Sequence, residues 1–207
     1  MADHDMPTGW TLHDTAIISP SGRYRYWLRR RLNWIMGDAP VVFCMLNPST
    51  ADATEDDPTI RRCIGYANQW GASDLVVVNL FALRSTDPAA LFADGVSDPE
   101  GPDNDTIIRY AAEFCAAHNG TFVCAWGSAG KTKAQQRYVA DRAATVLGII
   151  EDAGCEPTYL RRSEKTGQPG HPLYLPANLK PRRYRAMLAA SEGGGERDGT
   201  SAESGRG

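Results

Sequence analysis

Four short segments of this sequence place polar side chains directly after apolar runs, where amides and an imidazole could do chemistry. They are Leu46-Asn47-Pro48-Ser49, Val78-Asn79-Leu80-Phe81, Ala125-Trp126-Gly127-Ser128 and Gly170-His171-Pro172. A buried asparagine costs free energy unless it is hydrogen-bonded, so two asparagines at strand ends suggest a ligand pocket. An asparagine in such a place can equally satisfy the backbone of its own turn.

The segment before Asn47 predicts the strand around which the rest of the fold is built. Val41 to Leu46 form an unbroken apolar run, which is typical of a parallel strand buried on both faces. Pro48 cannot donate to a strand ladder, so the strand ends there and Asn47 lies at its carboxyl end. Ligands bind at that end of open α/β sheets, which makes Asn47 the first candidate for a site residue.

Apolar runs and helix signals alternate along the chain. Further strands are predicted at 75–81, 121–126 and 157–161, and helices at 58–70, 104–119, 134–153 and, shorter, 182–190. Asp57 as N-cap with Pro58 at the first helical position is a good helix start. The pattern predicts an α/β fold, a three-layer α/β/α sandwich with a mostly parallel four-stranded central sheet. Right-handed crossovers then place the ends of the first and third strands side by side, where strand order reverses.

An N-terminal β-hairpin precedes this unit, with arms at 15–19 and 23–31 around a Pro20-Ser21-Gly22 turn. In the second arm Arg23 and Arg25 alternate with Tyr24 and Tyr26, which puts cations on one face and aromatic rings on the other. Such a strand could grip a phosphate backbone. It could also be a solvated edge strand, whose charges discourage aggregation.

The length of the chain favours one domain. Its composition gives no global signature of nucleic-acid binding. The chain has 207 residues and a formal net charge of -3, so binding to a polyanion must rest on local patches. The five cysteines are scattered through apolar runs, which predicts buried thiols in a reducing compartment. We expect a single domain over residues 1–190, a disordered Gly/Ser/Glu-rich tail over 191–207, no membrane segment, and a cytoplasmic monomer.

In this order the four strand-end segments resemble the uracil-DNA glycosylase superfamily, over roughly residues 40 to 180. That superfamily has an α/β/α sandwich, a first motif with Asp or Asn before proline, an asparagine ending its second strand, a Trp-Gly and a final His-Pro loop. Asn47-Pro48, Asn79, Trp126-Gly127 and His171-Pro172 match these motifs. The chain also looks like a member of a bacterial and phage family that carries Leu-Asn-Pro-Ser-Thr-Ala-Asp and Asp-Asp-Pro-Thr-Ile-Arg-Arg.

The resemblance implies roles for individual residues in cleaving an N-glycosidic bond. Asn47 would hold the attacking water, mostly by positioning it, and His171 would donate a hydrogen bond to the departing base. Asn79 would read the pyrimidine edge and Phe81 would stack on the base. The remaining base-binding candidates are Pro48, Ser49, Trp126 and Gly127, and the DNA-binding candidates are Lys131, Lys133, Leu173, Tyr174, Lys180, Arg182 and Arg183.

Two features depart from the superfamily. The His-Pro segment continues Leu-Tyr-Leu-Pro in place of the usual serines, and Asn-Pro is followed by an acidic run from Asp52 to Asp57. The acidic residues could cap and charge a helix start, pair with Arg61 and Arg62, bind a metal, or select a base with a cationic substituent. We expect no metal site and no cofactor, because no His/Cys/carboxylate spacing fits zinc.

A glycine-rich turn follows the third predicted strand. The segment from Gly127 to Lys131 lacks the Walker spacing, which argues against nucleoside triphosphate binding. A single phosphate could still bind there, because the turn lies between a strand and a helix.

Three functions remain open at this level. The leading interpretation is a uracil-DNA-glycosylase-like enzyme that hydrolyses the N-glycosidic bond of uracil or a modified base in DNA. The alternative is a hydrolase or transferase acting on a free nucleoside or nucleotide, which the acidic run and the net charge favour. The third is a non-catalytic binder that keeps the fold and pocket.

Overall fold

The computed structural model describes residues 10–11, 15–32 and 39–185, and one seven-stranded sheet runs through it. The strand order is β1-β2-β4-β3-β5-β6-β7, and the four central strands β4, β3, β5 and β6 are parallel. β1, β2 and β7 each pair antiparallel with their neighbours. The strands are β1 (Ala16–Ile18), β2 (Arg25–Arg31), β3 (Val41–Met45), β4 (Asp74–Asn79), β5 (Thr121–Cys124), β6 (Pro157–Tyr159) and β7 (Arg182–Arg183).

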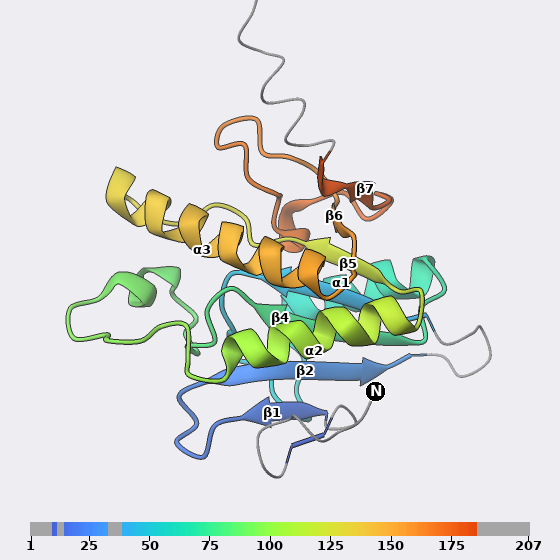
Figure 1. The fold of residues 1–207 in the computed structure, drawn as a ribbon, viewed down its shortest axis with the longest axis horizontal. Helices are drawn as coiled ribbons and strands as arrows, with labels where there is room; N and C mark the ends of the chain where they lie inside the picture. Colours follow the sequence, from blue (N-terminus) through green and yellow to red (C-terminus); the bar gives the residue numbers. More distant parts are fainter. Residues whose placement is uncertain (1–9, 12–14, 33–38, 186–207) are drawn as a thin grey trace, which may run out of the picture.

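Helices cover both faces of the sheet (Figure 1). Val42 and Cys44 of β3 pack with α2 (Asn104–Ala117) and α3 (Lys133–Asp152), whereas Val41 and Phe43 pack with α1 (Pro58–Gln69). Successive side chains of a strand point to opposite faces, so an unbroken apolar run fits this doubly covered position. Two short 3₁₀ helices, η2 (Pro88–Phe92) and η3 (Pro172–Tyr174), lie in the connecting loops.

The prediction of a mixed α/β fold is confirmed, but the strand count of four is wrong. All four predicted strands and the N-terminal hairpin are present, and the hairpin is part of the same sheet because β2 pairs with β4. The seventh strand is β7, whose two residues pair with Thr158 and Tyr159 of β6. The sequence predicts a helix from Arg182, but Arg182 belongs to this strand.

The interpretation of the second hairpin arm as a solvated edge strand is also wrong. β2 lies between β1 and β4, and Arg25 and Arg29 on it are buried. Both arginines have internal hydrogen-bond acceptors, which compensates in part for lost solvation. Arg23, one residue before the strand pairing begins with Tyr24, is exposed as the alternation predicts.

The start of α1 agrees with its sequence signal, and α3 begins at a capping box. Asp57 caps α1, its Oδ1 accepting from the backbone N–H of Ile60 at 2.9 Å, with Pro58 in the first turn. Thr132 and Gln135 form a capping box at the start of α3. The helices that follow the turns after β3 and β5, α1 and α3, therefore each begin at a capped residue.

The predicted reversal of strand order is confirmed. β3 has β4 on one side and β5 on the other, with Val42 paired with Val76 and with Phe122. The chain therefore leaves β3 and β5 in opposite directions across the sheet. This is the arrangement that opens a crevice at the carboxyl ends of parallel strands.

Of the remaining expectations, some fall on residues outside the described ranges and others can be compared with the structure. The predicted tail, 191–207, lies outside them, as does most of the predicted final helix. All five cysteines are buried and free, which confirms their expected burial. Within the described ranges, every helix is too short or too polar to cross a membrane.

The central position of β3 leads to a stability prediction. Val42 is fully buried between β4, β5 and the α2–α3 layer, so Val42→Ala should lower the free energy of unfolding by ~1–3 kcal/mol through lost burial and a cavity. Arg137→Ala is the control, because its side chain is 84% exposed and should change stability by less than ~0.5 kcal/mol. Urea denaturation measures both, and equal effects would contradict the central placement of β3.

Candidate functional site

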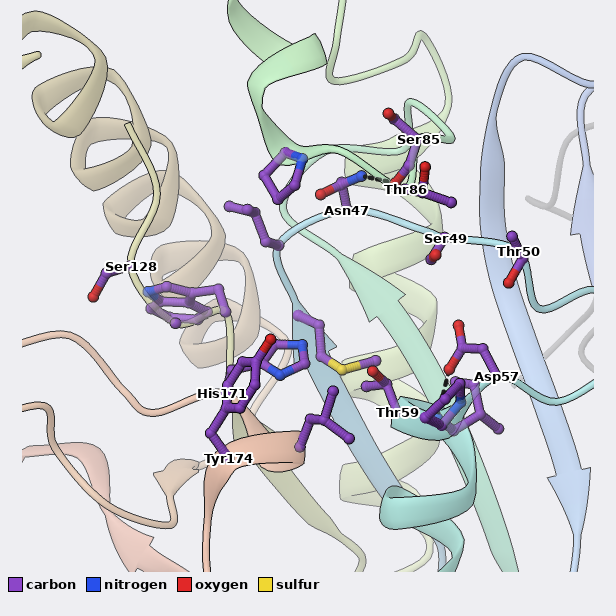
Figure 2. A pocket seen from close by; sticks show the side chains of 18 of the residues that line it. Asn47, Ser49, Thr50, Asp57, Thr59, Ser85, Thr86, Ser128, His171 and Tyr174 are labelled. Atoms are coloured by element: carbon purple, nitrogen blue, oxygen red, sulfur yellow. Dashed lines mark hydrogen bonds between the residues drawn. The ribbon is translucent and has the colours of Figure 1, made fainter. Parts of the chain in front are cut away.

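A cavity of about 640 Å³ opens where β3 and β5 end. We call it the central cavity. Its wall comes from the turn after β3, the first turn of α1, the loop after β4, the turn after β5 and the loop that carries η3 (Figure 2). The residues that line it are Arg25, Met45, Leu46, Asn47, Ser49, Thr50, Asp57, Pro58, Thr59, Ile60, Ser85, Thr86, Pro88, Trp126, Gly127, Ser128, Ser163, Gly170, His171, Leu173 and Tyr174.

Asn47 presents its amide in a fixed orientation. Nδ2 donates to the carbonyl oxygen of Ser85 at 2.9 Å and to that of Pro48 at 3.2 Å. Both amide protons are thus used by the protein, and the carbonyl oxygen Oδ1 is the atom left to accept from a ligand or a water. Figure 2 shows the amide nitrogen directed to the Ser85 segment and the oxygen on the opposite side. Asn47 therefore both braces its turn and offers an acceptor to the cavity.

His171 reaches the cavity from the loop before η3, opposite the turn that carries Asn47 (Figure 2). The loop that carries His171 comes close to the end of β5 at Gly127. Gly127 has φ +71°, and its backbone N–H donates to the carbonyl oxygen of Pro169 at 2.9 Å. A Cβ at residue 127 would lie 3.2 Å from Cβ of His171. Glycine is thus required at 127 both by its left-handed backbone and by the nearness of the histidine.

The imidazole of His171 is an unusual group. Burial lowers its pKa below the ordinary histidine value, and the charge of Asp57 opposes that shift. Its Nδ1 is buried and has no hydrogen-bond partner among the described residues. The ring is therefore neutral at neutral pH and can donate a hydrogen bond from one nitrogen without carrying a charge.

Trp126 anchors the loop that brings His171 into place. Its indole N–H donates to Oε1 of Gln168 at 2.9 Å, and the ring lines the cavity. The same loop is also held after η3, where the hydroxyl of Tyr66 on α1 donates to the carbonyl oxygen of Pro176. The exposed ring of Tyr174 lies at the mouth, 5.6 Å from the imidazole centroid. The cavity thus has one buried and one exposed aromatic surface.

The acidic run after Asn47 has structural partners. Asp52 accepts from the backbone of Thr54 and Glu55, and Asp56 forms an ion pair with Arg30 at 2.8 Å. Asp57 caps α1 and also lines the cavity. The alternative that these carboxylates pair with the Arg61 and Arg62 side chains is not seen among the described residues; the guanidinium of Arg61 donates to the carbonyl of Asp56.

Three of the predicted base-binding residues do not line the central cavity. Asn79 is 1% exposed, and its Oδ1 accepts from Nη2 of Arg25 at 3.4 Å. Phe81 is fully buried in the α2–α3 core, 5.4 Å from the ring of Tyr138. Pro48 is buried behind the Asn47 turn, with its carbonyl bonded to the Ser85 N–H. The strand ends two residues before Phe81, so that ring turns into the core and cannot stack on a base in this cavity.

Two further cavities adjoin the central one. The first, about 650 Å³, shares Pro88 and Ser128 with it and is lined by Lys131 and Lys165; we call it the lysine cavity. The second, about 450 Å³, shares Pro58 and Leu173 with it and is lined by Arg61 and Arg62; we call it the arginine cavity. Each flank of the central cavity thus carries two cations, with Asp87 the acidic residue of the lysine cavity.

The predicted site residues therefore divide into two groups. Those brought to the central cavity are Asn47, Ser49, Trp126, Gly127, His171, Leu173 and Tyr174. Among the predicted DNA-binding cations, Lys131 lines the lysine cavity. Lys133 begins α3, Arg182 and Arg183 form β7, and none of these nor Lys180 lines any of the three cavities. Arg183 instead pairs with Glu156 at 3.2 Å.

Sequence reasoning missed Arg25, Thr59 and the Ser85-Thr86 segment as cavity residues. Ser85 and Thr86 lie on the long loop after β4 and line the cavity. Arg25 had a signal in the Arg/Tyr alternation, but its burial depends on β2 joining β4. No group of three or more His, Cys, Asp or Glu side chains suited to a metal occurs within 10–11, 15–32 and 39–185.

Comparison with known proteins gives one family match. The model of a family described as "Protein of unknown function (DUF1643)" matches residues 25–173. The matched segment holds every residue that lines the central cavity except Tyr174. No curated protein and no solved structure matches the chain.

The approach of His171 to Gly127 leads to a prediction. Gly127→Ala should lower the free energy of unfolding by about 1–2 kcal/mol, because alanine is strained at φ +71° and its Cβ crowds His171. Gly148→Ala is the matched control: it lies in α3 with nothing within 4 Å of the added Cβ, and should stabilise by about 0.5–1 kcal/mol. Urea denaturation would contradict this reading if both substitutions stabilised the protein.

The partly buried imidazole of His171 leads to a pH prediction. Because the folded pKa of His171 is lowered, protons bind the unfolded chain first as the pH falls, and stability is lost below about pH 6.5. The free energy of unfolding of the wild type should therefore decline relative to His171→Gln between pH 8 and pH 5. Parallel pH profiles for the two proteins in urea denaturation would show that the imidazole is not buried in this way.

Proposed function

The chain belongs to the DUF1643 family, whose function is unknown, and we propose from its central cavity that it hydrolyses an N-glycosidic bond of uracil or a modified base in DNA. One observation carries the proposal. A single cavity at the reversal of strand order unites the free carbonyl oxygen of Asn47 with the imidazole of His171. These are the two groups that the resemblance to uracil-DNA glycosylases assigns to the water and to the departing base.

The reaction needs what these groups can provide. Water adds to the anomeric carbon of the sugar, the carbon–nitrogen bond breaks, and the electron pair leaves with the base. The oxygen of Asn47 would accept a hydrogen bond from that water and orient it, while an N–H of His171 would donate to an oxygen of the base as negative charge develops. The proton released by the water ends in solvent or on the base.

The size of the central cavity suits one nucleoside. About 640 Å³ lies within the range of small-molecule sites, and Trp126 offers one apolar wall. A base inside a duplex cannot reach such a cavity unless it rotates out of the stack. Leu173 and the exposed Tyr174 at the mouth could occupy the space that the base leaves.

The flanking cavities support a polynucleotide as the substrate. A strand that placed one nucleotide in the central cavity would pass its neighbouring phosphates over Lys131 and Lys165 on one side and Arg61 and Arg62 on the other. These are local cations on a chain whose formal net charge is -3.

A second candidate is a hydrolase or transferase acting on a free nucleoside or nucleotide. The observation in its favour is the burial of Asn79, since the asparagine expected to read a pyrimidine edge does not line the cavity. Asp57 on the wall also suits a small ligand with hydrogen-bond donors more than a polyanion. The same cavity would serve a non-catalytic binder.

The test is an abasic-site assay on single- and double-stranded oligonucleotides that contain uracil or a modified base. Asn47→Ala and His171→Ala should each lower the cleavage rate by at least about 100-fold, because each removes one contact to the reacting groups. His118→Ala is the control, since His118 lies exposed at the end of α2. Unchanged rates in folded variants would remove these residues from catalysis. Release of base from free nucleosides, with none from oligonucleotides, would favour the second candidate.

A further inference from the structure

Arg25 is a buried cation on the wall of the central cavity. It is 2% exposed, lies at the start of β2, and belongs to the lining of the cavity. Nη1 donates to the carbonyl oxygen of Ala51 at 2.8 Å, and Nη2 reaches Oδ1 of Asn79 at 3.4 Å. Nε has no hydrogen-bond partner among the described residues. The guanidinium is therefore held in place without all of its donors being used.

Arg25 differs in its counter-charge from Arg29 and Arg142, the other arginines that are buried within the described residues. Arg29 forms an ion pair with Asp74 at 2.8 Å, and Arg142 pairs with Glu100 and Asp105. No carboxylate of the described residues comes within 4.0 Å of Arg25. A buried guanidinium without a paired anion is costly, so an evolved fold rarely contains one without use.

Charges of both signs act on Arg25 from a distance. Asp57 and Asp52 favour its charged form, whereas Arg84 and Arg30 disfavour it. Burial is the largest effect and lowers the pKa of Arg25 to about 10, so the guanidinium still carries its charge at neutral pH. Asp57 already accepts from Ile60 in its capping role, and its charge makes the helix N-terminus itself a poor place for an anion.

We propose that Arg25 is the anion-recognition residue of the central cavity, where its guanidinium binds an anionic oxygen of the nucleotide that occupies the cavity. Asn79 is then a positioning residue that holds Nη2 from behind. The proposal deepens the proposed function and rests on it only in taking a nucleotide or its base as the ligand. Charge-assisted hydrogen bonds from arginine to anionic oxygen are about twice as strong as neutral ones.

Two oxygens of a nucleotide can carry the negative charge that Arg25 would bind. One belongs to the phosphate, which is charged before the reaction. The other belongs to the departing base, which gains negative charge as the glycosidic bond breaks. A cation on the cavity wall would strengthen binding of the substrate in the first case and of the base anion in the second.

Calorimetric binding to the full-length protein separates these cases with four probes: 2′-deoxyuridine, its 5′-monophosphate, uracil and the more acidic 5-fluorouracil. A phosphate contact predicts that the wild type binds the monophosphate at least about tenfold more tightly than the nucleoside. A contact to the base anion predicts tighter binding of 5-fluorouracil than of uracil, by a ratio that grows with pH. Either preference should disappear in Arg25→Gln and survive in Arg84→Gln, whose guanidinium lies near Arg25 but does not line the cavity.

A second variant guards against misfolding of Arg25→Gln, which also loses the bond to Ala51. Asn79→Asp leaves Arg25 in place and sets a carboxylate against Nη2, so it should weaken binding of the anionic probe in the same way. The proposal is overturned if the wild type shows neither preference, or if both folded variants keep it. If the wild type excises no base but shows a preference that depends on Arg25, the proposed hydrolysis is rejected and the anion site is retained.

Discussion

The burial of β3 on both faces is the constraint from which the site follows. Between Val41 and Met45 every side chain is buried, because α1 covers one face and α2 with α3 covers the other. A polar side chain has no place along such a strand unless it is fully paired. The chain can first present polar groups where the strand leaves its ladder, at Asn47. The reversal of strand order then sets the turns after β3 and β5 on either side of one cavity.

Much of this arrangement could be predicted from local sequence patterns. Apolar runs, the Asp57-Pro58 cap and the alternation of strands and helices depend on neighbouring residues, and the right-handed crossover rule converts them into strand order. That is why the β3–β5 junction, with Asn47, Trp126 and His171 around it, agrees with the prediction. The extent of the sheet could not be predicted in this way, since the pairing of β2 with β4 joins segments about 50 residues apart.

The errors at Asn79 and Arg25 have one physical origin. The sequence places Asn79 at a strand end, but its surroundings depend on what packs over that end. Because β2 runs beside β4, the guanidinium of Arg25 donates to the amide oxygen of Asn79, and Arg25 lines the cavity while Asn79 does not. An Arg/Tyr alternation read without its neighbours favours a solvated edge, whereas β1 and β4 on either side bury the same residues. Treating β2 as an edge strand thus led to the wrong expectation that Asn79 lines the pocket.

The charge distribution around the cavity argues for a ligand that is neutral in part and anionic in part. Arg25 and Asp57 share the central wall, so the interior carries both signs, whereas Lys131 and Lys165 on one flank and Arg61 and Arg62 on the other are cationic. A uniformly anionic ligand would meet Asp57 unfavourably, and a wholly neutral one would leave Arg25 without compensation. A nucleotide within a strand has both characters, because its base offers donors and acceptors while the phosphates on either side carry the charge. The formal net charge of -3 does not bear on this, because at physiological salt exposed charges interact over only about 8 Å.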